Sequence, residues 1–248
     1  FYFFIQRIKI MINKKEIPFI TLTNNERLQL GEVKVEINGE LTLQRFNFGI
    51  SVANRTSIIN HLIKKNNFRN YLEIGVRDLR NFEKINIENK IGVDPHPLKT
   101  NNNILRIDSD NFFLENKKKF DIIFIDGLHL EYQVDNDLKN SLKFLSDNGY
   151  IVMHDCNPPS EFHQREVYEV DGKFPSWNGT TWKSYAKLRI NNQNLTMSCV
   201  NCDWGVGIIN RGFQNKYKTV KKIDYSLLEE NRLKLLNLIS VKEFIENY

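Results

Sequence analysis

The sequence predicts a doubly wound α/β domain with a mostly parallel sheet, preceded by an N-terminal β-hairpin extension. Short apolar runs such as residues 121–126 lack the alternation of a half-exposed strand, as expected in the middle of a parallel sheet. Amphipathic helical segments separate these runs, which indicates repeated βα units with right-handed crossovers. Residues 32–37 instead alternate polar and apolar side chains, which is typical of a strand with one buried face.

Residues 1–53 form the predicted N-terminal β extension. The alternation of residues 32–37 resumes at residues 41–43, after Asn38-Gly39. Asn-Gly favours a type I′ hairpin turn, because both central residues of that turn need positive φ. Three roles of this extension stay open: a flap over the substrate, a strand pair that joins copies into a homo-oligomer, or an appendage without function. Residues 1–10 lack the features of a signal peptide, and Met11 would be a sensible initiator.

Residues 54–248 form the predicted α/β domain. Four apolar residues share one face of its first helix, residues 56–65, and Asn148-Gly149 is expected to end the helix at 130–145. Two capping boxes, at residues 226–229 and 240–243, predict helix starts in the tail. The predicted helices cover residues 56–65, 81–85, 130–145, 180–189 and 225–247. The seven predicted strands cover residues 71–74, 90–94, 103–107, 121–126, 150–153, 195–200 and 204–210.

The composition excludes several classes of protein. With 248 residues, 41% of them hydrophobic and 26% charged, the chain can bury a sizeable core and is not disordered. Its net charge of +5 comes from scattered lysines without interleaved aromatics, so no nucleic-acid partner is expected. No apolar run approaches the ~20 residues of a membrane span, so no membrane partner is expected and the cytoplasm is the expected location. Three cysteines are too few for a disulfide scaffold.

Acidic residues follow every predicted parallel strand. Ligands of an open parallel sheet bind outside the carboxyl ends of its strands, so these residues predict a site there. The residues are Glu73 and Gly75 around the end of the first strand, Asp94, Asp108, Asp126 with His129, and His154 with Asp155.

A nucleoside is the expected ligand on the first side of this site. Asp94 follows Glu73 by 21 residues, near the spacing at which an acid binds ribose hydroxyls in nucleotide folds. A turn or helix-capping role for Asp94 before Pro95 stays open. Only Gly75 is present where G-x-G-x-x-G would cradle a pyrophosphate, so a nucleoside without a diphosphate is predicted.

Over roughly residues 54–247 the sequence resembles class I S-adenosylmethionine-dependent methyltransferases, with their Rossmann-like sheet. The motifs that carry the resemblance are Tyr-Leu-Glu-Ile-Gly-Val76, Gly92-Val-Asp-Pro, Ile-Asp-Gly-Leu-His129 after the fourth strand, and His154-Asp-Cys-Asn-Pro after the fifth. Trp-Asn-Gly-Thr-Thr-Trp-Lys183 and Asp203-Trp-Gly-Val-Gly are also similar to segments of the subgroup that carries the Ile-Asp-Gly-x-His signature.

The resemblance implies roles for the residues that bind the cofactor, S-adenosylmethionine. Glu73 and Gly75 correspond to the first cofactor motif, where glycine lets the backbone approach the methionine portion. Asp94 corresponds to the acid that binds the ribose hydroxyls, and Asp108 to the group that meets the adenine amino group. The chain has residues 77–79, Arg-Asp-Leu, where the family usually offers a second glycine, which implies a wider loop or a shifted cofactor.

The sequence is also similar to metal-dependent sugar O-methyltransferases of macrolide pathways. This implies that Asp126, which also lies beside the cofactor, and Asp155 hold a divalent ion such as Mg²⁺, with His129 as the general base. His154 stands where those relatives carry an acid, and imidazole shifts the preference toward a transition metal. Alternatively no metal binds, and Asp155 orients His129 or His154 as the catalytic base.

The predicted reaction is transfer of a methyl group from S-adenosylmethionine to a hydroxyl of a sugar or glycan precursor. A metal-independent N- or O-methyltransferase of another small molecule, and a binding protein with a degraded cofactor loop, stay as alternatives. Trp177 and Trp182 either form an aromatic wall over a sugar or pack a loop against the sheet. Cys156 is expected in the core, and Cys199-Val-Asn-Cys202 has no second pair for a zinc site.

Overall fold

The computed structural model describes residues 27–37, 40–50 and 53–248. In the N-terminal extension, β1 (Arg27–Ile37) pairs antiparallel with β2 (Glu40–Ile50). The predicted Asn38-Gly39 turn lies outside the described residues, so the hairpin turn itself stays a prediction.

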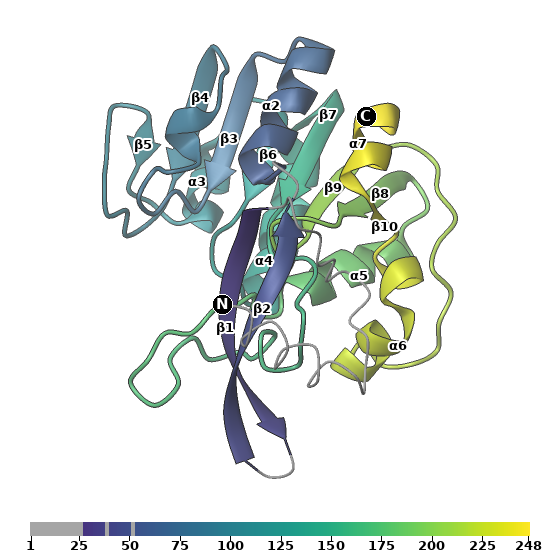
Figure 1. The fold of residues 1–248 in the computed structure, drawn as a ribbon. Coiled ribbons are helices and arrows are strands. Elements are labelled where there is room, and N and C mark those ends of the chain that lie inside the picture. The colour runs from purple at the N-terminus through teal and green to yellow at the C-terminus, as the bar shows by residue number, and fades with distance from the viewer. Residues whose placement is uncertain (1–26, 38–39, 51–52) are drawn as a thin grey trace.

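The α/β domain is built on one eight-stranded sheet with the order β10-β8-β9-β7-β6-β3-β4-β5 (Figure 1). The five strands from β7 to β5 are mutually parallel, whereas β9 runs antiparallel to both β7 and β8. The strands are β3 (Asn70–Ile74), β4 (Asn89–Val93), β5 (Ile104–Leu105), β6 (Phe120–Ile125), β7 (Leu145–Met153), β8 (Leu195–Val200), β9 (Val206–Arg211) and β10 (Leu238–Ile239). The α/β prediction with a mostly parallel sheet is confirmed.

The predicted number of seven strands is wrong, because a short eighth strand extends the sheet edge. β10 has only two residues and pairs in parallel with the end of β8. It interrupts the predicted helical tail, which forms α6 (Tyr225–Leu235) and α7 (Val241–Asn247) instead. The capping box at Ser240 and Glu243 is present, but α6 is capped by Asp224, whose side chain accepts from the Leu227 backbone N–H, and not by Ser226.

Alternating strand residues divide the core into two layers, one on each face of the sheet. In β6, Ile123 and Ile125 pack in one layer, whereas Ile122 and Phe124 pack in the other. The first layer is covered by α3 (Ser109–Glu115), α4 (Glu131–Phe144), α5 (Thr181–Asn191) and α6. The second is covered by α2 (Arg55–Asn66), the 3₁₀ turn η1 (Phe82–Lys84) and α7.

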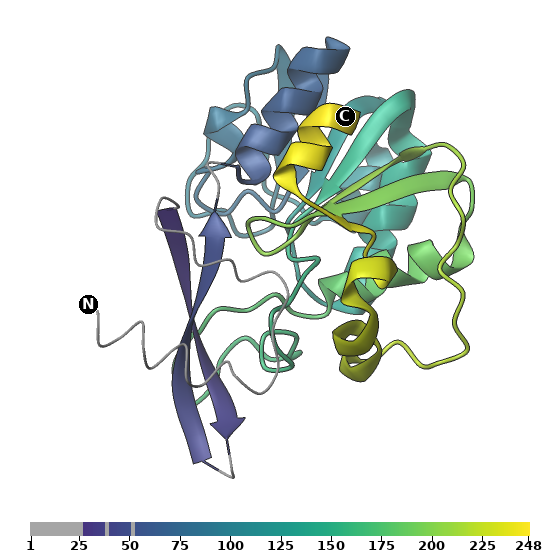
Figure 2. The ribbon, with the colours of Figure 1, turned by 45° about the vertical axis from the view of Figure 1, so that its right-hand side comes forward.

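Helices α2 and α7 lie side by side on their face of the sheet, although they stand near opposite ends of the described chain (Figure 2). The His61 ring of α2 lies 5.1 Å from the Phe244 ring of α7. A capping box between Asn54 and Ser57 starts α2 and fixes where its first residue, Arg55, enters the domain. No helix in the described ranges is both long and apolar enough to span a membrane.

Asn148-Gly149 does not end a helix, contrary to the prediction, but lies inside β7, which begins directly after α4. Gly149 is required there because a Cβ atom would lie 2.8 Å from the Asp121 carbonyl oxygen of the neighbouring strand. Glycine therefore marks close packing of two backbones at this position.

Candidate active site

A cavity of about 760 Å³ opens at the carboxyl ends of the parallel strands. All the residues that the sequence singled out around the strand ends line it, namely Glu73, Gly75, Asp94, Asp108, Asp126, His129, His154 and Asp155. The same cavity is also lined by residues that the sequence did not single out, among them Arg55, Asn81, Ser109, Gln133 and Asp137.

Glu73 ends β3 at the floor of the cavity and is buried. Its carboxyl group accepts a hydrogen bond from the Tyr71 hydroxyl at 2.5 Å and another from the Asn81 side-chain amide at 2.9 Å. Burial raises the pKa of Glu73 to about 8, because these two donors only partly replace the lost hydration. Glu73 is therefore largely protonated at neutral pH.

The loop after β3 has positive φ values at three residues, of which only Gly75 is a glycine. Gly75 has φ +87°, and a Cβ atom there would overlap the Asp126 carbonyl and lie 2.5 Å from Gly127 Cα. Arg77 and Leu79 also adopt positive φ, at 41° and 66°, which costs about 1 kcal/mol or more for such side chains. The loop thus adopts glycine-favoured conformations at residues that carry side chains, and the wider loop or shifted cofactor stays a prediction.

Asp94 follows β4 and organises the same loop. One carboxylate oxygen accepts from the Arg77 backbone N–H at 2.8 Å, and the other accepts from the His96 backbone N–H at 2.8 Å. The turn role that stayed open for Asp94 is therefore real. It still lines the cavity, and each oxygen keeps a lone pair for a further donor.

Asp108 caps α3 at the far side of the cavity by accepting from the Asn111 backbone N–H at 2.8 Å. Behind it lies a buried pair that sequence reasoning missed: the Ser109 hydroxyl donates to the Asp137 carboxyl at 2.5 Å. Burial raises the pKa of Asp137 to about 6. Gln133 donates to both members of the pair, which completes a polar wall on this side.

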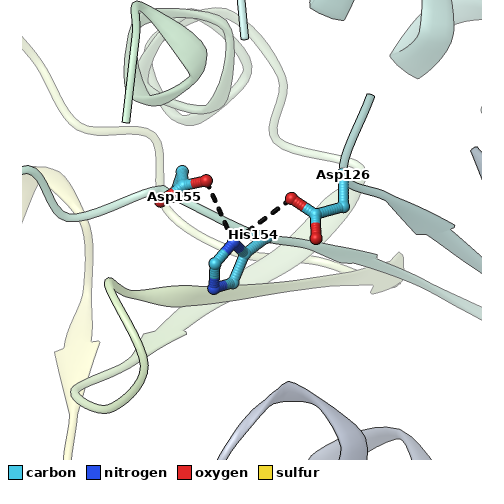
Figure 3. Close-up of side chains that lie close together, drawn as sticks. All are labelled: Asp126, His154 and Asp155. Carbon is cyan, nitrogen blue, oxygen red and sulfur yellow. Dashed lines mark hydrogen bonds and ion pairs between the residues drawn. The ribbon is translucent and has the colours of Figure 1, made fainter. Parts of the chain in front are cut away.

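Two aspartates and two histidines meet where β6 and β7 end. His154 Nδ1 lies 2.9 Å from a carboxylate oxygen of Asp155 and 3.2 Å from one of Asp126, so it bridges the two acids (Figure 3). His129 contacts the same two acids, with Nε2 3.4 Å from Asp126 and Nδ1 3.3 Å from Asp155. The sequence predicted this grouping, because neighbouring parallel strands end at one edge of the sheet.

Arg55 and Asp203 complete this cluster, and neither was predicted to belong to it. The Arg55 guanidinium lies 2.5 Å from His154 Nε2, 3.3 Å from Asp203 and 3.8 Å from Asp126. Asp203 is buried and also accepts from the Arg55 backbone N–H at 2.9 Å. Asp203 begins the segment Asp-Trp-Gly-Val-Gly, one of the motifs that carry the family resemblance, whereas no local pattern marks Arg55.

Neighbouring cations keep Asp126 and Asp203 ionised although burial raises the pKa of a carboxyl group. Burial raises the pKa of Asp126, but His154, His129 and Arg55 hold it well below its usual range. Asp203 has a pKa lowered to about 2, because His154 and Arg55 outweigh its burial. Burial lowers the pKa of His129, and the carboxylates of Asp155 and Asp126 more than reverse that effect, so its pKa is raised.

A ladder of aromatic rings leads from His129 toward the mouth of the cavity. The Trp177 ring stacks on His129 at 5.0 Å, Tyr168 stacks on Trp177 at 5.2 Å, and Phe174 lies 5.1 Å from Tyr168. Phe174 is 61% exposed although it lines the cavity. Trp177 therefore lies where an aromatic wall was considered, whereas Trp182 is fully buried in the core and forms no such wall.

Contacts of Arg165 and Gly179 hold the 160–180 segment, which carries these aromatic rings. The Arg165 guanidinium donates to the backbone carbonyls of Ser176 and Pro175, each at 2.9 Å. Gly179 has φ +60°, and a Cβ atom there would lie 2.6 Å from His129 Cβ. The absence of a side chain at Gly179 lets the segment press directly against His129.

The cysteines are buried in the core. Cys156 and Cys199 are buried in one core layer and Cys202 in the other. Burial raises the pKa of each thiol. Among the described residues, the metal-compatible grouping is Asp126, His154 and Asp155, and no cysteine belongs to it.

Comparison with known proteins bears on the enzyme class. Residues 53–156 match the family described as Methyltransferase domain, whereas no curated protein matches the chain. The SAH-bound Podospora anserina methyltransferase PaMTH1 is 18% identical to this chain. The match covers 64% of this chain and 79% of PaMTH1, with a TM-score of 0.50. At that identity the likeness shows a shared fold alone.

Two further solved structures are more distant. The O-methyltransferase from Bacillus cereus in complex with SAH is 11% identical over 83% of this chain and 88% of its own, with a TM-score of 0.44. MycE of the mycinamycin pathway, in complex with Mg, SAH and mycinamycin VI, is 15% identical over 65% of this chain and 50% of its own, with a TM-score of 0.41. The family match indicates a methyltransferase domain over residues 53–156, in agreement with the predicted methyltransferase class for this part of the chain.

Proposed function

We propose that the chain transfers a methyl group from S-adenosylmethionine to a hydroxyl group of a sugar or glycan precursor, with His129 as the general base. The observation that carries this proposal is the position of His129. Its ring lies between two carboxylates at the strand ends and an aromatic side chain of the 160–180 segment, within one cavity.

The donor occupies the β3–β4–α3 side of the cavity in this proposal. Gly75 lets the backbone approach the methionine portion, while Asp94 receives the ribose hydroxyls. Glu73, being largely protonated, offers a neutral carboxyl beside the sulfonium rather than a strong counter-charge. Asp108 and the polar wall behind it face the adenine end. A nucleoside fits this set of groups without any cradle for phosphate.

The acceptor lies between His129 and the aromatic ladder. A sugar hydroxyl hardly ionises at neutral pH, so its attack on a methyl sulfonium needs a base that takes the proton. The oxygen forms a bond to the methyl carbon, the carbon–sulfur bond breaks to give a neutral thioether, and the proton moves to His129. Asp126 and Asp155 stabilise the imidazolium that forms, and both lie within 3.4 Å of its nitrogens. The ring faces of Tyr168 and Phe174 suit the flat C–H face of a sugar ring.

A divalent ion does not fit the cluster as it is arranged. One atom from each of Asp126, His154 and Asp155 lies within 4.8 Å of the others, which is a spacing that a small cation can bridge. However, the Arg55 guanidinium lies 3.8 Å from Asp126 and 2.5 Å from His154 Nε2, so a fixed positive charge already opposes these carboxylates. Deprotonation of the acceptor hydroxyl therefore depends on His129 alone in this proposal.

Methyl transfer from radiolabelled S-adenosylmethionine to a panel of free and nucleotide-activated sugars tests the proposal. With an accepted sugar, His129→Asn should lower turnover by about 100-fold or more, as expected for loss of a general base, while S-adenosylhomocysteine binding stays within about threefold of wild type. Unchanged turnover in His129→Asn would remove His129 from the reaction. Transfer to amines but to no hydroxyl would favour the N-methyltransferase alternative.

A further inference from the structure

We infer that Arg55 serves as the resident cation of the Asp126–His154–Asp155 cluster and excludes a divalent metal ion from it. The inference deepens the proposed function, since it makes the methyl transfer metal-independent. It stands on contacts within the cluster, however, and its test requires neither an acceptor nor methyl transfer.

Arg55 reaches the cluster beside the His154 ring and also approaches Asp126. Its terminal nitrogen lies 2.5 Å from His154 Nε2, while His154 Nδ1 lies 2.9 Å from Asp155 and 3.2 Å from Asp126. The imidazole therefore lies among one guanidinium and three carboxylates, since its Nε2 is also 3.4 Å from Asp203.

His154 is surrounded on both ring nitrogens by groups of the cluster. Its Nε2 lies 3.4 Å from an Asp203 carboxylate oxygen, and the Arg55 terminal nitrogen that lies 2.5 Å from Nε2 also lies 3.4 Å from Nδ1. A guanidinium has only donors and keeps its charge, so Arg55 holds a permanent positive charge against this ring and the carboxylates around it. A metal ion that took His154 as a ligand would have to lie beside that charge.

Arg55 also supplies the positive charge that a metal would otherwise bring. Its guanidinium lies 3.8 Å from Asp126 and 3.3 Å from Asp203, and its side chain is only 31% exposed. Partial burial strengthens these interactions relative to an exposed ion pair. A divalent ion at the same carboxylates would meet this fixed positive charge at short range.

The backbone holds Arg55 in this place. Asn54 caps α2 by accepting from the Ser57 backbone N–H, and the Arg55 backbone N–H donates to Asp203 at 2.9 Å. Asp203 itself has φ +44°, a conformation that costs energy for a non-glycine residue, and it is buried. The guanidinium is thus anchored from both its main chain and its side chain by one aspartate.

Mn²⁺ titration followed by electron paramagnetic resonance tests the inference on the full chain. Arg55→Ala should bind Mn²⁺ about tenfold or more tightly than wild type, because the positive charge that repels the ion is gone. Adding Asp155→Asn to Arg55→Ala should abolish the gain. Arg80→Ala is the matched control, since Arg80 also lines the cavity but is 81% exposed and pairs with Asp78, and it should bind Mn²⁺ like wild type.

Equal Mn²⁺ affinity of wild type and folded Arg55→Ala would overturn the inference, as would wild-type binding that Asp155→Asn removes. If Arg55→Ala does not fold, Arg55→Gln replaces it, because glutamine keeps a hydrogen-bond donor and removes the charge. Arg55→Gln should bind Mn²⁺ about tenfold or more tightly than wild type, whereas Arg55→Lys, which keeps the charge, should bind it like wild type, and equal affinity of all three proteins contradicts the inference. Failure of the proposed methyl transfer would leave these measurements unaffected.

Discussion

Replacing the buried carboxyl group of Glu73 with an amide, Glu73→Gln, should remove a large pH dependence from the stability of the fold. Glu73 is 2% exposed, and the Tyr71 hydroxyl and the Asn81 amide are its hydrogen-bond donors. Burial raises its pKa from 4.5 to about 8. Between these values the folded chain holds a proton that the unfolded chain has lost, so stability falls as the pH rises.

The size of the effect follows from the two pKa values. Each pH unit inside the window lowers the free energy of unfolding by about 1.4 kcal/mol. From pH 5 to pH 7 the wild-type chain should lose about 2.5 kcal/mol through this one group, after allowing for partial titration near 4.5. The glutamine variant lacks this proton, so its stability relative to wild type should rise by that amount over the same range.

Urea unfolding at 25 °C, at half-unit steps from pH 5 to pH 7, measures this difference. Asp121→Asn is the matched control at the opposite end of the sheet. Burial raises the pKa of Asp121, but hydrogen-bond donors such as the Arg69 backbone N–H outweigh burial and lower it. The stability that Asp121 contributes is therefore lost only when the pH falls below the pKa of an ordinary aspartate. The control difference should therefore stay flat from pH 5 to pH 7. A flat difference for Glu73→Gln as well would refute the argument that burial keeps Glu73 protonated.

Three further substitutions test the site and the core. Gly179→Ala should reduce turnover by displacing His129. The control Gly172→Ala, also at positive φ but with open space around it, should leave turnover unchanged, and equal losses in the two variants would contradict the close approach at Gly179. Phe174→Ala should raise KM for a sugar acceptor with kcat nearly unchanged, and an unaltered KM would remove the ladder from acceptor binding. Trp182→Ala should lower the free energy of unfolding by about 3–5 kcal/mol in a urea titration, and a cost below about 1 kcal/mol would contradict its place in the core.

The central strands could be predicted because parallel strands buried on both faces leave continuous apolar runs. The predicted strand at 195–200 agrees with β8 at both ends, and the first four strands were placed within a few residues. β10 could not be foreseen, since two residues carry no periodicity and pair only because the chain returns to the edge at β8. The predicted helix end at Asn148-Gly149 was wrong for a related reason. Gly149 is small because the backbone of the neighbouring strand passes close to it, and the local sequence does not reveal that contact.

The acidic half of the site could also be predicted, because strand order alone brings Asp126 and Asp155 to one edge. Arg55 could not, since its partner Asp203 lies 148 residues away and only the folded chain joins them. The sequence showed an acid–histidine cluster, for which the resemblance implied a metal ion. The structure adds a guanidinium to this cluster, and its position depends on the docking of α2 against the loop before β9.

Calorimetric titration with S-adenosylhomocysteine, on wild type, Asp94→Asn and the Asp121→Asn control, tests the central claim most directly. The account predicts micromolar binding by wild type and by the control, and a loss of about tenfold or more in Asp94→Asn, whose side chain at the end of β4 would receive the ribose hydroxyls. No heat from folded wild-type protein at millimolar ligand would contradict the assignment of this cavity to S-adenosylmethionine.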